Sequence, residues 1–142
     1  MSDLELFARL IQCEAGGEGD NGMRAVASVV MNRVNVVYGE YGRYNTLREV
    51  IFQTGQFNCA RTVLGGQVNL QNVYNMNPQQ IHYDIANWAI AGGRLTNLGE
   101  ALWFFNPYSL NCQNFFPTVV GYFVVRVGDH CFYNPNTPYA VT

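Results

Sequence analysis

The stretch QCEAGGEGDNGMRAV, residues 12–26, places a cluster of acidic residues and glycines between two segments with helical periodicity. Glu14, Glu18 and Asp20 fall close together, and the first basic residue to follow is Arg24. A solvated helix face usually mixes charges of both signs and avoids glycine, which destabilises a helix interior. The stretch is therefore predicted to join two helices at an acidic corner.

The residues before this junction predict the first helix. Ser2 and Glu5 have the spacing of a capping box, in which each side chain bonds a free backbone N–H of the other residue. Apolar residues then recur at helical intervals as far as Ala15. Gly16 and Gly17 are expected to end the helix, because glycine readily adopts the backbone conformations found at helix C-termini.

The residues after the junction predict a second helix, with Asp20 or Asn21 as its N-cap. Its polar face would carry Arg24, Asn32 and Arg33. Its apolar face would be formed by Met23, Val26, Ala27, Val30, Met31 and Val34. The two helices are thus expected to pack through their apolar faces and to meet at the acidic corner.

Two shorter helices are predicted further along the chain. Thr46 and Glu49 repeat the capping-box spacing and open a short helix that fades at Gly55. Asn77 and Pro78 favour the start of another helix, because proline suits the first helical turn. The inward face of that helix would consist of Ile81, Ile85, Trp88 and Ala89.

The C-terminal part of the chain predicts strands instead. ALWFFNP (101–107) and VVGYFVVRVGDHCFY (119–133) are rich in aromatic and β-branched residues and are bounded by turn-forming residues. Helices followed by a small sheet indicate an α+β fold, and 142 residues suit a single domain spanning 1–142. The polar segment 58–77 is longer than loops in compact domains usually are, so we expect it to form a binding rim.

Composition argues against several classes of function. Hydrophobic residues make up 49% of the chain, which indicates a folded globular protein. The net charge is −2 and the arginines are scattered, so nothing resembles the basic stripe that nucleic acid requires. The segment MSDLELFARL lacks the positive start of a secretion signal, and no apolar run is long enough to span a membrane. Neither nucleic acid nor a membrane is therefore an expected partner.

The cysteines, at positions 13, 59, 112 and 131, show no CxxC spacing, and His82 and His130 are the only histidines. This set does not fit a structural zinc site, so no metal or other cofactor is expected. The cysteines are interpreted as buried reduced thiols of a protein made in a reducing compartment. They also allow several disulfide pairings, and the sequence does not choose among them.

The chemical interest of the acidic corner lies in Glu14. It is predicted in the last turn of the first helix, at the negative end of the helix dipole and close to Glu18. Both effects would raise the pKa of Glu14, as would burial against an apolar wall. A carboxyl group that keeps its proton near neutral pH suits a general acid acting on a glycosidic oxygen. Simpler interpretations are a solvated loop, or a calcium site with Asp20 as a third ligand, although the spacing does not match an EF-hand.

Several segments in a fixed order carry a family resemblance. The segments EAGGE (14–18) with NRV (32–34), IFQTGQF (51–57), ALWFFNP (101–107) and VGDHCFY (127–133) resemble the cell wall hydrolases of the SleB/CwlJ type, the spore cortex-lytic enzymes. The resemblance extends over nearly the whole chain, which makes it far more specific than any single motif. One difference is Gly16, where the family often has arginine.

The resemblance implies a fold similar to lytic transglycosylases and goose-type lysozyme, with a mainly helical lobe, a small antiparallel β lobe and a cleft between them. It implies that Glu14 is the single catalytic acid and that the substrate is peptidoglycan, cleaved between N-acetylmuramic acid and N-acetylglucosamine. The sequence offers no obvious second carboxylate, which favours lytic transglycosylation over the two-carboxylate mechanism of most glycosidases.

The residues expected to contact the glycan strand are Glu18, Gln56, Phe57, Trp103, Phe105, Asn106, Tyr122 and His130. Simpler roles compete for most of them. Phe57 and Trp103 suit a hydrophobic core, and Asn106 suits the turn before Pro107. His130 suits a structural hydrogen bond at least as well as a proton relay.

Two other classes of function are open on the sequence alone. Cys13 with His82 or His130 as base would make a cysteine peptidase acting on wall peptides, although the carbonyl end of a helix disfavours a thiolate. A non-catalytic coat or glycan-binding protein is the second alternative. The absence of a signal and of a wall-binding repeat resembles the CwlJ branch, which implies synthesis in the mother cell, a place in the spore coat or cortex and spore coat proteins as partners.

Overall fold

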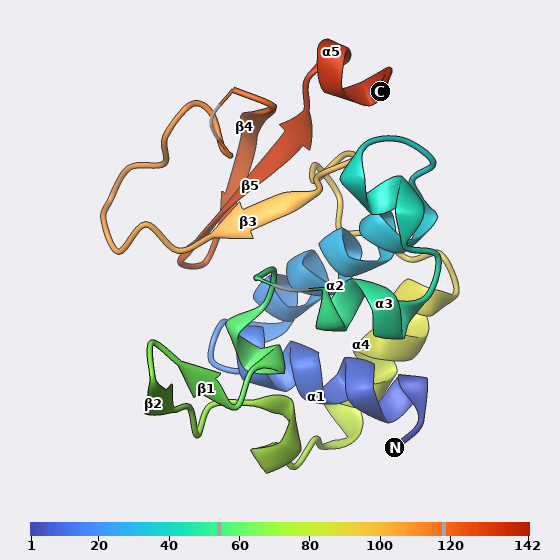
Figure 1. The fold of residues 1–142 in the computed structure, drawn as a ribbon, viewed down its shortest axis with the longest axis vertical. Helices are drawn as coiled ribbons and strands as arrows, with labels where there is room; N and C mark the ends of the chain where they lie inside the picture. The colour runs from blue at the N-terminus through green and yellow to red at the C-terminus, as the bar shows by residue number, and fades with distance from the viewer. Residues whose placement is uncertain (54, 118) are drawn as a thin grey trace.

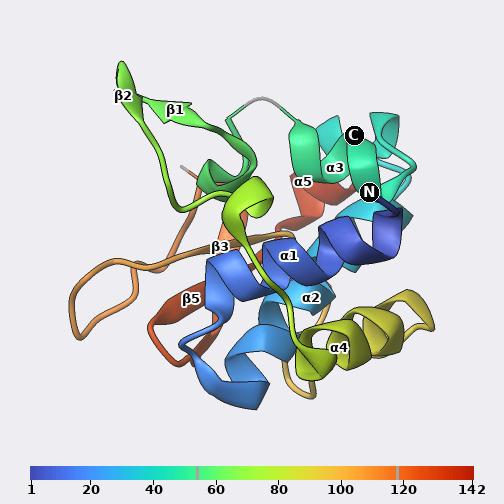
Figure 2. The same cartoon turned by 90° about the horizontal axis from the view of Figure 1, so that it is seen from below.

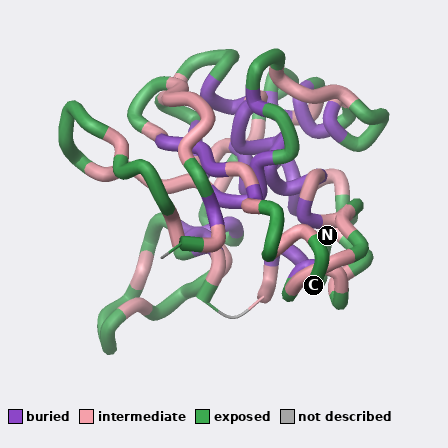
Figure 3. The backbone as a smooth tube through the Cα atoms, turned by 90° about the horizontal axis from the view of Figure 1, so that it is seen from above, coloured by how far each residue is buried: buried purple, intermediate pink, exposed green. Residues whose placement is uncertain are grey.

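A computed structural model describes residues 1–53, 55–117 and 119–142. The chain forms a lobe of helices and a smaller lobe built on an antiparallel sheet (Figure 1). The buried residues gather in the interior of the molecule, whereas the loops that project outward are largely exposed (Figure 3). The predicted α+β fold is confirmed. Within the described residues, no helix has the length and apolar character needed to cross a bilayer.

Helix α1 (Asp3–Ala15) has the predicted cap and end. The backbone N–H of Glu5 donates to Oγ of Ser2 over 3.1 Å. Gly16 follows the helix directly, and a Cβ atom at this position would collide with a carbonyl oxygen of the preceding turn. The fully buried side chains of α1 include Leu6, Phe7, Ala8, Leu10 and Ile11. Helix α1 therefore forms one side of the helical core and carries Glu14 in its last turn.

Helix α2 (Gly19–Asn35) begins earlier than predicted, with Glu18 rather than Asp20 or Asn21 at the N-cap position. Asp20 is not free to cap the helix, because its carboxylate pairs with Arg24 one turn later, over 2.7 Å. The predicted polar face is wrong at Arg33, which is only 4% exposed. Aromatic rings from other segments cover this arginine, and helical periodicity alone cannot show such a contact.

The 3-10 turn η1 (Glu40–Arg43) leads into α3 (Leu47–Phe52), whose predicted cap is confirmed. Oγ1 of Thr46 accepts a hydrogen bond from the N–H of Glu49 over 3.1 Å. The helix ends before Gly55, and residue 54 lies outside the described residues. Helix α3 packs against both α1 and α2, so this short element is held by the helical core.

Helix α4 (Gln80–Ile90) starts later than the predicted cap at Asn77. Gln79 is the N-cap residue, and its N–H donates to Nδ1 of His82 over 2.9 Å. This capping box outweighs the helix-start signal of the asparagine and proline before it. The predicted inward face is wrong at Ile81, which is 38% exposed. Helices α1, α2 and α4 pack against one another to form the helical lobe (Figure 2).

The segment predicted as a long polar loop contains short ordered elements. They are η2 (Asn58–Ala60), β1 (Val63–Leu64), β2 (Gln67–Val68) and η3 (Val73–Asn75). Strands β1 and β2 form a hairpin whose turn residues, Gly65 and Gly66, both have positive φ, as tight hairpin turns require. The hairpin projects from the helical lobe in both ribbon views (Figures 1 and 2).

The C-terminal sheet has three antiparallel strands in the order β3–β5–β4. The strands are β3 (Trp103–Phe105), β4 (Gly121–Val127) and β5 (His130–Pro135), and the short helix α5 (Thr137–Ala140) follows them. The run predicted as a strand at 119–133 is therefore two strands. Gly128, with φ of +58°, turns the chain between them.

The two faces of the sheet belong to different hydrophobic clusters. Side chains alternate along β5, so Phe132 joins the cluster of the helical lobe, whereas Cys131 and Tyr133 join a second cluster with Trp103. Phe104 is paired with Phe132 across the sheet, and their ring centres lie 5.6 Å apart. The sheet therefore turns the face that carries these two rings toward the helical lobe.

All four cysteines form disulfides, so the prediction of reduced thiols is wrong. Cys13 is bonded to Cys59 and Cys112 to Cys131, with Cα atoms 6.1 Å and 5.8 Å apart. The partners are 46 and 19 residues apart in sequence. Only the tertiary fold brings them together, which is why spacing alone did not identify the pairs.

Candidate active site

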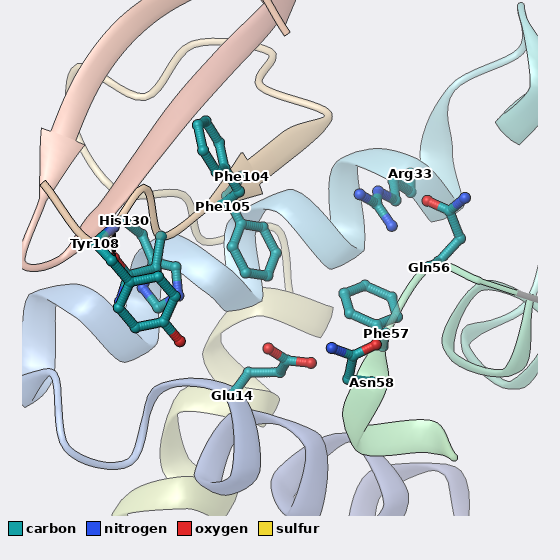
Figure 4. A pocket seen from close by; sticks show the side chains of 10 residues that line it. Glu14, Arg33, Gln56, Phe57, Asn58, Phe104, Phe105, Tyr108 and His130 are labelled. Atoms are coloured by element: carbon teal, nitrogen blue, oxygen red, sulfur yellow. Dashed lines mark hydrogen bonds between the residues drawn. The ribbon is translucent and has the colours of Figure 1, made fainter. Parts of the chain in front are cut away.

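A pocket of about 290 Å³ lies where the helical lobe meets the sheet, and the carboxyl group of Glu14 points into it (Figure 4). Side chains from α1, α2, the segment 56–58 and the region of β3 and β5 line this pocket. The lining residues are Glu14, Arg33, Gln56, Phe57, Asn58, Phe104, Phe105, Asn106, Tyr108 and His130. Residues from distant parts of the sequence therefore surround one carboxyl group.

Burial dominates the electrostatics of Glu14. Desolvation raises the pKa of Glu14 to about 7, while a hydrogen bond from the backbone of Cys59 and the charge of Arg33 act in the opposite direction. The sequence correctly predicted a raised pKa, but the helix dipole and Glu18, which were expected to contribute, are not its main cause. The carboxylate of Glu18 is turned toward His130 instead. Near neutral pH, both protonation states of Glu14 are therefore well populated.

Arg33 lines the pocket, although the sequence placed it on a polar helix face. Its Nε donates to the carbonyl oxygen of Leu102 over 2.7 Å. The central guanidinium carbon lies 4.6 Å from the ring centre of Tyr41 and 4.9 Å from that of Phe57, and such cation–π contacts are favourable. The NRV segment was the signal in the sequence, but nothing local indicates that its arginine turns inward.

Gln56, Phe57 and Asn58 form one wall of the pocket (Figure 4). Oε1 of Gln56 accepts a hydrogen bond from the hydroxyl group of Tyr41 over 2.7 Å. Phe57 is only 3% exposed, and its ring centre lies 6.2 Å from that of Phe104. The structure thus places the predicted Gln56 and Phe57 in the pocket, and adds Asn58, which no sequence pattern had indicated.

A disulfide holds this wall beside the acid. Cys13 directly precedes Glu14, and its partner Cys59 directly follows Asn58. The bond therefore ties the last turn of α1 to the segment that carries the wall. Its position explains how two segments far apart in sequence keep a constant spacing across the pocket.

His130 lies on the other side of Glu14 from Arg33 (Figure 4). Its Nδ1 is 2.6 Å from Oε1 of Glu18, and its ring meets that of Phe104 edge-on, with centres 5.3 Å apart. Glu18 accepts a hydrogen bond from the backbone N–H of Asp129 over 3.2 Å. Because Nδ1 faces the carboxylate of Glu18, the nitrogen that His130 has available for a ligand is Nε2.

Aromatic and amide groups after β3 complete the lining. Phe105 and Asn106, which were expected to contact the glycan, line the pocket, as do Phe104 and Tyr108, which were not among the expected contacts. Oδ1 of Asn106 accepts a hydrogen bond from the N–H of Tyr108 over 2.8 Å, which shapes the turn. Tyr108 is 90% exposed, so it forms part of the rim rather than the floor.

Three residues expected to contact the glycan lie outside this pocket. Glu18 joins the start of α2 to the β4–β5 turn through His130, as described above. Trp103 is 3% exposed and meets Tyr139 edge-on in the second cluster, with ring centres 5.1 Å apart. The hydroxyl of Tyr122 on β4 accepts a hydrogen bond from Asn134 over 3.4 Å. Burial and sheet register, which are set by tertiary packing, account for these placements.

The structure contradicts the cysteine peptidase. Cys13 is bonded to Cys59, so it offers no thiolate, and His82 caps helix α4. The calcium site is also wrong, because its proposed ligands diverge. Glu14 enters the pocket, Glu18 turns to His130, and Asp20 pairs with an arginine of its own helix. Within the described ranges, no group of three His, Cys, Asp or Glu side chains comes together as a metal site.

The pocket has the chemistry of a single acid. Among its lining residues in the described part of the chain, Glu14 is the one carboxylic acid. With a pKa of about 7, Glu14 is able to donate a proton and, once ionised, to accept one. The surrounding aromatic rings offer apolar faces, and the amide groups offer hydrogen bonds, a combination that suits a polar ring compound such as a sugar.

Comparison with known proteins identifies similar sequences. A family described as Cell Wall Hydrolase matches residues 17–133. Among curated proteins, the cell wall hydrolase CwlJ of Bacillus subtilis is 28% identical over 134 residues, which cover 94% of this chain and 86% of that protein. CwlJ of Halalkalibacterium halodurans is also 28% identical, over 95% of this chain and 87% of the relative.

Solved structures resemble the fold as well. The catalytic domain of the germination-specific lytic transglycosylase SleB from Bacillus anthracis is 27% identical, with a TM-score of 0.64 and coverage of 93% of both chains. The catalytic domain of SleB from Bacillus cereus is 27% identical, with a TM-score of 0.65, and the match covers 93% of this chain and 89% of that one. The similarity therefore includes both lobes.

Proposed function

The chain belongs to the Cell Wall Hydrolase family, and we propose that it cleaves peptidoglycan between N-acetylmuramic acid and N-acetylglucosamine with Glu14 as its single acid and base. The family acts on the cell wall, and the fold is the lysozyme-like fold of the SleB catalytic domains. The bond, the mechanism and the roles of individual residues are our proposals, as is the assignment of residues 1–142 to one catalytic domain.

The observation that carries the proposal is the raised pKa of Glu14 in a pocket without a second carboxylic acid among its described lining residues. Most glycosidases flank the scissile bond with two carboxyl groups, one as acid and one as nucleophile or base. A lytic transglycosylase needs one carboxyl group only, because the substrate supplies the nucleophile. SleB of B. anthracis is described as a lytic transglycosylase, which supports this choice.

The proposed reaction has two proton transfers. Protonated Glu14 gives its proton to the glycosidic oxygen as the bond from this oxygen to muramyl C1 breaks, and the bonding electron pair leaves with the oxygen. The carboxylate then takes the proton from the muramyl C6 hydroxyl, whose oxygen bonds to C1 and closes a 1,6-anhydro ring. Glu14 ends protonated again, so no metal or other cofactor is required.

The other lining residues are proposed to hold the glycan strand across Glu14. Gln56 and Asn106 offer amide groups, Phe57 and Phe105 offer ring faces, and His130 offers Nε2. For the three predicted contacts outside the pocket, we propose structural roles instead. Glu18 would orient the histidine, while Trp103 and Tyr122 would support the sheet.

The test compares Glu14→Gln with the native chain on purified sacculi and spore cortex. The native protein is expected to lower turbidity and to release muropeptides with anhydromuramic ends, detected by mass spectrometry, and Glu14→Gln to lose at least about a thousandfold in rate. Glu5→Gln is the matched control, because Glu5 lies on the same helix, outside the pocket, where it is half-buried and pairs with Arg9 over 3.5 Å.

Each other outcome has a definite meaning. Clearing by Glu14→Gln at the native rate would overturn the assignment of the acid. Reducing muramic ends in place of anhydromuramic ends would show hydrolysis rather than transglycosylation. Native protein that pellets with sacculi and leaves them turbid would identify a glycan-binding protein.

Spore cortex is the proposed site of action. The relatives are named cell wall hydrolase CwlJ, and SleB is described as germination-specific. We propose a place in the spore coat, next to the cortex and in contact with coat proteins. The two disulfides support a working environment outside the reducing cytoplasm, and they are compatible with synthesis in the mother cell followed by oxidation.

A further inference from the structure

We infer that Arg33 is a positioning residue for the reaction, which stabilises the carboxylate that Glu14 becomes when it gives up its proton. The inference rests on the proposed function for its role in catalysis. The coupling between the two side chains also has a test that does not depend on catalysis.

Arg33 is a buried cation that is held rigidly. Its side chain lies between the rings of Tyr41 and Phe57, and Nε is fixed on the carbonyl oxygen of Leu102. Within the described residues, Nη1 is buried and has no hydrogen-bond partner. Burial lowers the pKa of Arg33, which shows that its environment disfavours the charge. Within the described residues, Arg33 forms no ion pair. A buried charge without an ion-pair partner normally destabilises a fold, so its presence beside a pocket points to function.

Glu14 is the buried carboxyl group that shares this pocket with Arg33 (Figure 4). The other groups whose charge bears on Arg33 are Glu40, Tyr41 and Tyr139. Glu40 is exposed to solvent. Burial raises the pKa of Tyr41 to about 12 and also raises the pKa of Tyr139, so both phenols are neutral at pH 7. Compared with these two phenols, Glu14 is therefore the group whose charge changes near neutral pH.

The charge of Arg33 matters at the moment when the acid acts. When the glycosidic bond breaks, Glu14 changes from neutral to negative inside a desolvated pocket. A fixed positive charge nearby stabilises that change without any reorganisation during the reaction. Arg33 therefore makes Glu14 a stronger acid than burial alone would allow, while burial keeps Glu14 protonated often enough to act near neutral pH. On the far side of the pocket, His130 is already paired with Glu18.

The first test measures the ionisation of Glu14 directly, by NMR of its side-chain carboxyl carbon in the ligand-free protein. Arg33→Met, which removes the charge, is expected to lower the acid dissociation constant of Glu14 about tenfold relative to the native protein. In Arg33→Lys, which keeps the charge, the constant is expected to stay close to its native value. Arg48→Met is the matched control, because Arg48 lies at the surface and pairs with Asp3 over 3.0 Å. An unchanged titration in folded Arg33→Met would overturn the inference.

The second test measures the pH dependence of kcat/KM on sacculi. In the native protein the acid must be protonated, so activity is expected to fall as pH rises through about 7, the pKa of Glu14. In Arg33→Met, this fall should move to higher pH, while kcat below pH 6 drops about tenfold. A merely structural arginine would lower kcat at every pH and leave the position of the fall unchanged, which would count against the inference.

A third variant keeps a hydrogen-bond donor at this position in case Arg33→Met does not fold. Arg33→Gln removes the charge but retains an amide N–H that can donate to the carbonyl oxygen of Leu102. The acid dissociation constant of Glu14 is expected to fall as it does in Arg33→Met, and an unchanged constant in the folded variant would contradict the coupling. If the NMR results hold but sacculi are not cleaved, the coupling stands and the proposed function fails.

Discussion

At the scale of single residues, the pocket depends on opposing influences on one carboxyl group. Burial holds the proton on Glu14, and Arg33 together with the backbone at Cys59 favours its release. The result is a pKa of about 7, at which an acid used near neutral pH donates and accepts protons with similar ease. The same arrangement has a consequence for folding stability, because a side chain that is buried when neutral resists ionisation.

We predict that Glu14→Gln stabilises the protein above pH 7 but not at pH 4. The pKa of an ordinary glutamate is 4.5 and that of Glu14 is about 7 in the fold, so the folded state binds more protons between these values. The native free energy of unfolding should therefore fall by up to about 3 kcal/mol as pH rises through that range. In Glu14→Gln the free energy of unfolding should not show this fall, because the glutamine side chain does not ionise.

Urea unfolding of both proteins at a series of pH values on either side of the pKa of Glu14, about 7, measures the effect, with Glu5→Gln as the control. The difference in free energy of unfolding between Glu14→Gln and the native protein should widen with pH up to about 7 and then stay constant. If this difference were constant across the whole pH range, Glu14 would have the same pKa in the folded and unfolded chains, which would contradict the prediction.

At the scale of elements, the start of α2 is connected to the β4–β5 turn. Glu18 bonds the backbone N–H of Asp129 and lies against Nδ1 of His130. The turn itself depends on Gly128, whose Cβ position would lie 3.3 Å from the carboxyl group of Glu18. The helix and the hairpin therefore meet through an interaction that fixes how His130 is presented to the pocket.

We predict that Glu18→Ala raises KM on sacculi several-fold, with a smaller effect on kcat. His130 would lose its fixed orientation, while Glu14 and its surroundings would be unchanged. The free energy of unfolding should fall by about 2 kcal/mol, because the charged hydrogen bond between Glu18 and the N–H of Asp129 is lost. Asp20→Ala is the control, since Asp20 lies on the same helix but pairs with Arg24 at the surface. Equal KM values for Glu18→Ala and the control would argue against this orienting role.

At the scale of the whole molecule, each lobe has its own disulfide, and each disulfide includes a cysteine that is next in sequence to a pocket residue. Cys13–Cys59 joins α1 to η2 in the helical lobe. Cys112–Cys131 joins the loop after β3 to β5, and Cys131 directly follows His130. The pocket is thus formed by two separately cross-linked units, and its shape depends on how firmly each disulfide holds its own lobe.

We predict that removing either disulfide by paired Cys→Ser changes destabilises the protein. From the 46-residue and 19-residue separations, loop-closure entropy gives a loss of about 4 kcal/mol for Cys13–Cys59 and about 3 kcal/mol for Cys112–Cys131. The measurement is urea unfolding with and without a reducing agent. Reduction should lower the free energy of unfolding of the native protein by the sum of the two losses, and insensitivity to reduction would contradict a stabilising role of the disulfides.

Much of the fold followed from local patterns. Ser2 and Thr46 cap the predicted helices because a cap depends on residues three positions apart. The aromatic run around Trp103 forms a strand because bulky side chains favour extended backbone. The prediction that α4 starts at Asn77 was wrong, because a capping box at Gln79 begins the helix two residues later than the predicted cap.

The sequence by itself determined the end of α1 at the acidic corner, the α+β order and the position of Glu14 in the last turn of that helix, because these depend on neighbours along the chain. The tertiary structure alone decided the cysteine pairs, the inward turn of Arg33 and the contact between Glu18 and His130. Desolvation and long-range charge depend on every segment that surrounds a group. The pKa of Glu14 was therefore predictable in direction, while its principal cause, burial by residues far away in sequence, required the folded chain.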